Sequence, residues 1–434
     1  MTPLAWLLCF SDPERGVGWN PRASPDRFWK PGRERALLDL AGAPDRALRI
    51  VTIAGTNGKG STGAFLESIA RAAGRRTGVC SQPHLHRFRE RVRLDGEPIG
   101  EARFAAQVGR LAAVVDRLRA RYPSAGEPTT FELTTVLAAL TFAETGVDLA
   151  VFDVGIGGRF DPVNALHPSL SILTSIGLDH TQVLGGTITA IAREKAGVMR
   201  PGVVALSARQ RSAAARVLAR EGERIGARLA FVDPLPLAGA ATPEGQPVGL
   251  GHGVAARLSL LGAHQRQNAA LAVRAATELE LPFEVVPDGL ARAIWPGRLE
   301  WVAGRPPLLL DGAHNPDGAR ALSAALGEIA AGARCGLLFG CARDKDASGM
   351  LRWLLGRAER VWVAAAAEPR ATPPEALAAI IARLGRRAEP ATSVASALAA
   401  ARASGVGLVV VAGSLRVVAE AREALGLAQK EEPA

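Results

Sequence analysis

The chain has 434 residues, of which 48% are hydrophobic and 22% charged. This composition excludes a disordered, collagen-like or coiled-coil protein, and the length suits two domains with separate cores. The net charge of +10 comes from scattered cations, of which only five are lysines. Because aromatic residues make up only 5%, no stacking platform for single strands is expected. We therefore expect a solvated arginine-rich surface and no nucleic-acid partner.

The cysteines and the apolar segments indicate a compartment. The four cysteines contain no C-x-x-C pair and no zinc-like spacing, which predicts reduced thiols in a cytoplasm. The apolar stretch 4–10 is short and lacks preceding basic residues, unlike a signal peptide. No uncharged apolar run approaches the ~20 residues of a membrane-spanning helix. We expect a cytoplasmic monomer without a membrane partner.

Strand and helix patterns alternate along the first 200 residues. Strands are predicted at 48–54, 77–81, 148–154 and 169–176. Helices are predicted at 101–120, 131–145 and 187–196, and a further one runs from the glycine-rich loop at 55–61 to residue 73. Such alternation is typical of a parallel sheet with helices on both faces.

The pattern breaks twice and then restarts. Residues 233–253 are rich in Pro, Gly and Ala, which predicts loops and irregular strands on the rim of the first domain. A second break at 295–298 precedes predicted strands at 308–310, 336–340, 361–365 and 408–412 and helices at 318–331, 347–355 and the C-terminal end. We expect two domains, 1–297 and 298–434.

A glycine-rich loop follows the first strand. Such a strand, loop and helix present backbone N–H groups and a helix N-terminus to phosphates, with Lys59 at the β- and γ-phosphates and Ser61 or Thr62 at Mg²⁺. The alternative is a generic glycine-rich turn. The predicted fold is α/β: a P-loop parallel-sheet ATPase domain followed by a smaller Rossmann-like α/β domain. The expected ATP-binding residues of the loop are Gly55, Thr56, Asn57, Gly58, Lys59, Gly60 and Ser61.

The loop departs from the general P-loop pattern, because Gly60 separates Lys59 from Ser61. It resembles instead the loop of the Mur ligase superfamily and, within it, of folylpolyglutamate synthases and dihydrofolate synthases. Further segments match that family in the same order: 81–85 with 90–93, 129–132, 153–161, 178–181, 193–197, 267–268, 296–298, 310–316 and 344–346. One such segment is weak evidence, but the ordered set is specific.

The resemblance implies roles for particular residues. It places Asn268 at adenine, Arg298 at phosphate and Asp311 at the nucleotide. The resemblance places His314 and Asn315 at glutamate, and the alternative for both is an Asn-Pro turn. It places Arg159 at the pteroate or folate, and the alternative is an exposed cation. The implied pteroate or folate contacts are Pro83, His84, Thr129, Thr130, Phe131, Glu132, Arg159, Phe160, Asp161 and Pro162.

The resemblance also implies a site for two Mg²⁺ ions. Lys195 would react with CO₂ to give a carbamate ligand, which arginine cannot form because it stays protonated. The alternatives are an exposed helical lysine, a capping role for Asp153 and a loop role for His180. The family usually has Ser where this chain has Gln82 and Glu where it has Asp153, so either Ser81 or Gln82 could be the ligand. The implied metal ligands are Ser61, Ser81, Gln82, Asp153, His180 and Lys195, and the implied catalytic residues are Lys59, Lys195 and His180.

The predicted reaction joins L-glutamate to a pterin-bearing carboxylate. Amide formation in water is uphill, so ATP must first convert the carboxylate to an acyl phosphate. We expect a bifunctional dihydrofolate synthase/folylpolyglutamate synthase whose partners are ATP, L-glutamate and dihydropteroate or folate. The alternatives are a monofunctional folylpolyglutamate synthase, a peptidoglycan precursor ligase or another Mur-type amino-acid ligase, a P-loop nucleic-acid-dependent ATPase, and a non-enzymatic scaffold.

Overall fold

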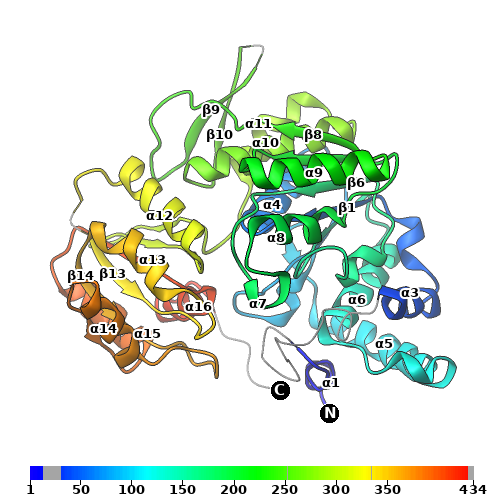
Figure 1. Cartoon of the computed structure of the whole chain (residues 1–434), viewed down its shortest axis with the longest axis horizontal. Helices are drawn as coiled ribbons and strands as arrows, with labels where there is room; N and C mark the ends of the chain where they lie inside the picture. Colours follow the sequence, from blue (N-terminus) through cyan, green and yellow to red (C-terminus); the bar gives the residue numbers. More distant parts are fainter. Residues whose placement is uncertain (13–30, 252, 334, 429–434) are drawn as a thin grey trace. The chain divides into compact units, whose positions relative to one another are not determined.

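The structure, a computed structural model, describes residues 1–12, 31–251, 253–333 and 335–428 (Figure 1). The chain divides into two compact units. Of the described residues, the first unit contains those within Met1–Leu235 and Gln267–Ala293, and the second contains those within Pro236–Arg266 and from Ile294 to residue 428. The division falls within the helix α10 (Ala263–Glu278).

The first unit is built on an eight-stranded sheet of order β4-β3-β2-β5-β1-β6-β7-β8. Strands β2, β5, β1, β6, β7 and β8 are parallel, and β3 and β4 are antiparallel additions at one edge. Every residue of β1 and β5 is buried, as expected for strands covered on both faces. The strands are β1 (Ile50–Ala54), β2 (Thr77–Cys80), β3 (Val92–Leu94), β4 (Glu97–Pro98), β5 (Leu149–Asp153), β6 (Leu170–Leu173), β7 (Val204–Ala208) and β8 (Arg228–Val232).

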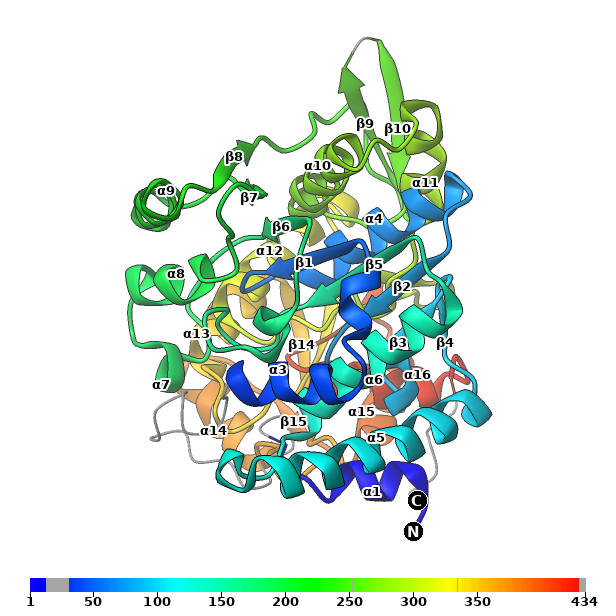
Figure 2. The ribbon, with the colours of Figure 1, turned by 90° about the vertical axis from the view of Figure 1, so that its right-hand side faces the viewer.

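Helices cover both faces of this sheet. Figure 2 shows α4 and α11 on one side of β1, β5 and β2, and α3, α5 and α6 on the other. The expected arrangement of a parallel sheet between helices is confirmed. The helices are α1 (Pro3–Leu8), α3 (Pro31–Leu40), α4 (Lys59–Ala72), α5 (Glu101–Arg121), α6 (Thr130–Thr145), α7 (Thr181–Leu184), α8 (Ile188–Ala196), α9 (Ser212–Ile225) and α11 (Val286–Arg292).

Helix α6 illustrates how local sequence fixes this layer. Thr129 is its N-cap, and Gly146 ends it in the left-handed conformation. Every residue from Thr130 to Phe142 is buried, so the helix is covered on all sides and presents no solvent-exposed polar face. The ring of Phe142 packs edge-on against Phe152, with 5.5 Å between the ring centroids, and joins the helix to β5.

The second unit contains a six-stranded sheet of order β11-β12-β16-β13-β14-β15. All neighbouring strands are parallel except β11, which runs antiparallel to β12. The strands are β11 (Glu300–Val302), β12 (Leu308–Leu310), β13 (Cys335–Phe339), β14 (Ala358–Val363), β15 (Glu389–Pro390) and β16 (Leu408–Ala412). The helices are α12 (Pro316–Ile329), α13 (Ala347–Leu354), α14 (Pro374–Arg383), α15 (Val394–Ala403) and α16 (Leu415–Ala424).

An antiparallel hairpin, β9 (Gln246–Gly251) with β10 (Val254–Leu258), begins within residues 233–253, which the sequence assigned to the rim of the first domain. The structure groups Pro236–Arg266 with the second unit instead. The buried Gln246 amide donates to the carbonyls of Leu260 and Gly262, and Leu261 joins Leu299 in the core of the second unit. Composition alone does not reveal such long-range packing.

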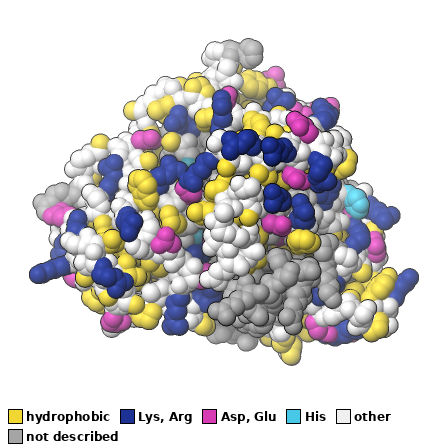
Figure 3. All heavy atoms as spheres, viewed as in Figure 1, with side chains coloured by type: hydrophobic (Ala, Val, Ile, Leu, Met, Phe, Trp, Pro, Cys, Tyr) yellow, Lys and Arg dark blue, Asp and Glu magenta, His cyan; other side chains and the backbone are white. Residues whose placement is uncertain are grey.

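Charge and apolarity on the outside agree with the compositional analysis. On the face drawn in Figure 3, Lys and Arg side chains are interspersed with acidic, apolar and neutral ones. Among the residues that the structure describes, no helix combines the length and the apolarity needed to cross a bilayer.

Two glycines test the packing of the first sheet. A Cβ at Gly78 in β2 would lie 2.5 Å from the Phe142 ring, whereas a Cβ at Gly109 in α5 would meet nothing within 4 Å. We expect Gly78→Ala to lower the free energy of unfolding by about 1–3 kcal/mol through overpacking. Gly109→Ala should instead raise it by roughly 0.5–1 kcal/mol, because glycine is a poor residue for a helix interior. Urea unfolding measures both, and equal effects would contradict this packing.

Candidate functional site

The loop between β1 and α4 requires glycine at two positions. Gly55 has φ +151°, and a Cβ there would lie 1.8 Å from Thr174 Oγ1. Gly58, the N-cap of α4, has φ +97°, and its Cβ would lie 2.3 Å from Asn268 Oδ1. Both the backbone angle and the close neighbours therefore exclude a side chain. The predicted adenine contact, Asn268, thus lies directly against the loop.

The first residues of this loop form hydrogen bonds with backbone carbonyl groups of the segment after β6. The N–H groups of Thr56 and Asn57 donate to Ser175 O, and the Thr56 hydroxyl donates to Gly177 O. Lys59, Gly60 and Ser61 form the first turn of α4, where the backbone N–H groups have no acceptors within the helix itself. Phosphate binding by the residues of this loop stays a prediction.

Two lysines donate to one carbonyl oxygen at the start of the loop. Lys59 Nζ lies 3.1 Å and Lys195 Nζ 2.7 Å from Gly55 O. Lys195, from α8, is buried, so it is not an exposed helical lysine. Burial, and then the nearby charge of Lys59, lower the pKa of Lys195 to about 7. A large fraction of this side chain is therefore a neutral amine near neutral pH.

The glycine-rich segment after β5 packs closely against α8, the helix that carries Lys195. A Cβ at Gly158 would lie 2.8 Å from Glu194 O, and one at Gly197 would lie 2.5 Å from Arg159 Cα. Asp161 fixes the turn, because its carboxylate accepts hydrogen bonds from the N–H groups of Gly155, Ile156 and Val163. Burial raises the pKa of Asp161 to about 7.

Other predicted residues of this segment differ in exposure. Pro162 is buried and Phe160 is half-buried. The Arg159 guanidinium lies 4.0 Å from the Glu221 carboxylate. Their roles as substrate contacts stay predictions.

The predicted metal ligands lie at strand and helix ends. Asp153 ends β5 and is 2% exposed, and a Cβ at Gly63 would lie 3.9 Å from its Oδ1. Ser61 and Ser81 are buried as well. His180, by contrast, is exposed at the start of α7 with φ +48°. Within the described residues, no three His, Cys, Asp or Glu side chains form a group that could hold a metal.

Most polar side chains of the segment 129–132 form hydrogen bonds with other groups of the protein. The Thr129 hydroxyl accepts from Glu132 N, and the Glu132 carboxylate accepts from Thr129 N and from Arg33, at 2.8 and 2.7 Å. The Thr130 hydroxyl lies 3.2 Å from the carbonyls of Leu7 and Phe10. Of the four predicted substrate contacts, Phe131 lies nearest the glycine turn, 3.0 Å from a Cβ placed at Gly155.

In the second unit, Asp311 fixes the turn that holds Arg298. Its carboxylate accepts from the N–H groups of Leu299 and Ala313, at 2.8 and 2.9 Å. A Cβ at Gly312 would lie 2.5 Å from Arg298 Nη1, so the guanidinium lies against this turn. His264 was not identified from the sequence. Burial lowers its pKa, and Asp311 and Arg298 are close enough to influence it electrostatically.

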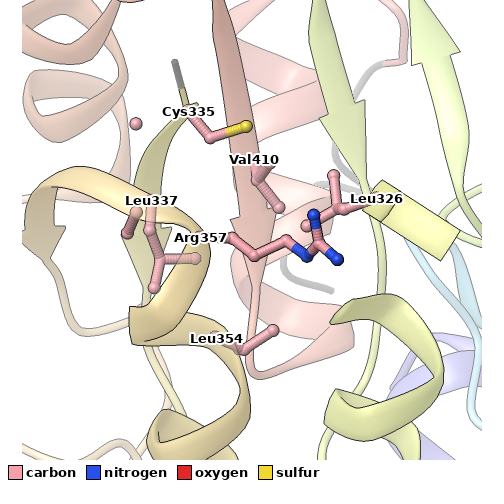
Figure 4. A pocket seen from close by; sticks show the side chains of 8 residues that line it. Leu326, Cys335, Leu337, Leu354, Arg357 and Val410 are labelled. Carbon is pink, nitrogen blue, oxygen red and sulfur yellow. The ribbon is translucent and has the colours of Figure 1, made fainter. Parts of the chain in front are cut away.

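The predicted glutamate residues follow the same strand. His314 Nδ1 lies 2.9 Å from Gly312 O, and Asn315 caps α12 by accepting from Gly318 N at 2.8 Å. The turn that was the alternative for these residues therefore exists, and a role in glutamate binding stays a prediction. A small hollow elsewhere in this unit, lined by Leu326, Cys335, Arg357 and neighbouring side chains, contains none of the predicted site residues (Figure 4).

In the first unit, a buried acid close to Glu132 was not predicted from the sequence. Glu34 in α3 is fully buried, and neither of its carboxyl oxygens makes a hydrogen bond. Burial, followed by the charge of Glu132, raises the pKa of Glu34 well above its ordinary value. Its α3 neighbour Arg33, which binds Glu132, was also not identified. No local pattern distinguishes either residue from those of an ordinary surface helix.

The glycine-rich loop on a parallel-sheet unit and the second α/β unit agree with the fold of solved folylpolyglutamate synthases, which places the chain among the ATP-dependent ligases of the Mur type. Residues 297–415 match the family model of the Mur ligase glutamate ligase domain. The chain belongs to the dihydrofolate synthase/folylpolyglutamate synthase family, which confirms the resemblance seen in the sequence.

Several relatives establish this membership. The dihydrofolate synthase/folylpolyglutamate synthase of Bacillus subtilis is 37% identical over 79% of this chain and 82% of its own length. The Escherichia coli relative with the same description is 33% identical over 91% of both chains. The fold is similar to Mycobacterium tuberculosis folylpolyglutamate synthase complexed with ADP, with a TM-score of 0.86, 32% identity and coverage of 99% of this chain and 100% of that chain.

The buried Arg33–Glu132 ion pair predicts a stability effect. The side chains are 5% and 0% exposed, so Glu132→Gln leaves a buried guanidinium without its counter-charge. We expect the free energy of unfolding to fall by about 3–5 kcal/mol. Glu127→Gln, which removes the exposed partner of Arg119, should cost no more than about 1 kcal/mol. Equal losses in urea unfolding would show that the buried pair is not structural.

Proposed function

We propose that this chain uses ATP to join L-glutamate to the carboxylate of a pterin-bearing acid, either dihydropteroate or a folylglutamate. The observation that carries the proposal is the pair of lysines on Gly55 O, at the entrance to a helix N-terminus. That arrangement suits a nucleoside triphosphate. The names of the relatives supply the class of the other substrates, and a solved Escherichia coli relative is described as a complex with DHPP and ADP.

The reaction has two steps in this proposal. A carboxylate oxygen of the pterin substrate attacks the γ-phosphorus, the bond to ADP breaks, and an acyl phosphate forms. The amine of L-glutamate then attacks the acyl carbon, phosphate leaves and the nitrogen loses a proton. Lys59 and the N–H groups at the start of α4 stabilise the charge on the transferred phosphoryl group.

Lys195 has the environment that carbamate formation requires. CO₂ adds to a neutral amine, and the nitrogen then releases a proton to give a carbamate anion. The pKa of Lys195, about 7 because of burial, makes that amine accessible near neutral pH. The resulting carboxylate would turn a buried cation into an anionic ligand.

The oxygen-rich donor set fits Mg²⁺. We propose Ser61, Asp153 and carbamylated Lys195 as ligands for two ions, with Ser81, Gln82 and His180 as further candidates. Bound Mg²⁺ would neutralise the phosphates and align them with the carboxylate. The four cysteines are free thiols, which supports the cytoplasmic location expected from the sequence, where the protein would act as a monomer.

The experiment that tests this function measures ADP release with L-glutamate, in parallel with dihydropteroate and with tetrahydrofolate. Release that depends on both glutamate and a pterin substrate supports the proposal. Activity with both pterins, and competition between them, identifies a bifunctional enzyme, whereas activity with tetrahydrofolate alone identifies a folylpolyglutamate synthase. Release that depends on nucleic acid rather than on glutamate would overturn the proposal.

The carbamate predicts a specific rescue. Lys195→Ala should lose most of the activity, and added bicarbonate or a short carboxylic acid should restore part of it by supplying the missing carboxylate. Lys195→Arg should be inactive and should not respond, because a guanidinium neither forms a carbamate nor leaves room for the added acid. Near-normal turnover of the alanine variant would rule out this role.

Asp153 predicts a change in the metal requirement. Asp153→Asn keeps the size of the side chain but removes a charge from the proposed site, so half-maximal activity should need at least about tenfold more Mg²⁺. Asp148→Asn, at an exposed position before the same strand, is the matched control and should leave the titration unchanged. An unaltered Mg²⁺ titration of the Asp153 variant would exclude it as a ligand.

A further inference from the structure

Two consecutive residues, Glu90 and Arg91, form hydrogen bonds with the loop at residues 82–87. Glu90 and Arg91 belong to the short helix η2 (Phe88–Arg91), which follows the loop directly. The Glu90 carboxylate accepts hydrogen bonds from the N–H groups of Leu85, His86 and Arg87, at 2.8, 3.1 and 2.9 Å. These three bonds fix the backbone of the loop.

Arg91 acts on the side chains of the same loop. It is 2% exposed, its Nε donates to His84 Nδ1 at 3.0 Å, and its Nη1 lies 3.5 Å from Gln82 Oε1. The guanidinium lies 4.7 Å from the centroid of the Phe88 ring, which is 5.7 Å from the His84 ring. Arg91 is therefore packed in place by an aromatic ring while it contacts two residues predicted to serve the site.

The chemistry of arginine determines the state of both partners. A guanidinium only donates hydrogen bonds and stays protonated in proteins. His84 Nδ1 must therefore be the acceptor, which makes His84 a neutral imidazole with its proton on Nε2. The Gln82 carbonyl oxygen must likewise face Arg91, so that its NH₂ group faces Gly155, where a Cβ would lie 2.3 Å from Nε2.

We propose that Arg91 is a positioning residue that holds His84 as an Nε2–H donor and Gln82 with its NH₂ group toward Gly155. This inference rests on the proposed function, because it assigns these donors to the pterin-bearing substrate. Two fixed donors on one loop select a ligand group that accepts hydrogen bonds, such as the benzoyl carbonyl or the carboxylate of that substrate. In this arrangement Gln82 contributes a donor, and Ser81 remains as the ligand for Mg²⁺.

The first test reads the state of His84 without any substrate. In long-range ¹H–¹⁵N correlation spectra of the full chain at pH 8, His84 should show the Nε2–H tautomer, with its signal identified by its loss in His84→Asn. Arg91→Met should give a mixture of tautomers, because the donor to Nδ1 is gone. Arg89→Met is the matched control, since Arg89 lies on the same short helix but donates to Ile99 O and Glu101. An Nδ1–H tautomer in the natural chain, or no change in Arg91→Met, would overturn the proposal.

The second test separates positioning from general stability. Arg91→Lys keeps the charge but cannot reproduce the two directed bonds. We expect the KM for the pterin substrate to rise about tenfold, the scale of one lost charged hydrogen bond, with the KM values for ATP and L-glutamate unchanged. Arg89→Lys should leave all three KM values as they are. A uniform loss of kcat without a change in the pterin KM would contradict the proposal.

A double variant links the arginine to the histidine. If Arg91 acts through His84, the effects of Arg91→Lys and His84→Asn on the pterin KM should combine to less than their product. Full additivity would show that the two residues act separately. An absence of ligase activity in the natural chain would refute the proposed function, while the spectra of His84 would still decide the role of Arg91.

Discussion

The geometry of the first unit depends on one carbonyl oxygen. Gly55 O accepts hydrogen bonds from Lys59, at the start of α4, and from Lys195, in α8. At this oxygen the glycine-rich loop between β1 and α4 therefore meets α8. Only glycine fits at position 55, since Thr174 fills the space that a Cβ would take.

Three carboxylates shape the surroundings of this point by accepting hydrogen bonds from backbone N–H groups; Asp161 and Glu132 are buried, and Glu90 is half-buried. Asp161 fixes the turn after β5, and Glu90 fixes the loop after β2. Glu132 fixes the start of α6 and also neutralises Arg33. Because each carboxylate satisfies donors that would otherwise lose their hydrogen bonds on burial, these loops keep a defined shape. Residues such as Phe131 and Gln82 then gain fixed positions.

The sequence predicted the strand-loop-helix unit from local pattern and singled out Lys195 through the ordered motifs, but the burial of Lys195 emerged only from the structure. The sequence did not predict that Thr129, Thr130 and Glu132 would be engaged by the protein, since their partners are 99 or more residues away or belong to the same cap. The structure groups the hairpin β9–β10 with the second unit, whereas the sequence placed this stretch in the first domain, because contacts between distant segments leave no mark on local composition. Arg91 stood in a recognised motif, but only geometry revealed its contacts with Gln82 and His84.

The different roles proposed for the two lysines follow from burial. Two ammonium groups that donate to the same carbonyl oxygen repel each other. The more buried amine therefore loses its proton more easily. Lys195 is 4% exposed, whereas Lys59 is only half-buried at the helix start. Burial, and then repulsion by Lys59, lower the pKa of Lys195; the repulsion would disappear once a carbamate replaced the ammonium, because Lys59 would then face an anion. This electrostatic change favours the proposed modification, whereas an arginine at position 195 would leave both charges in place.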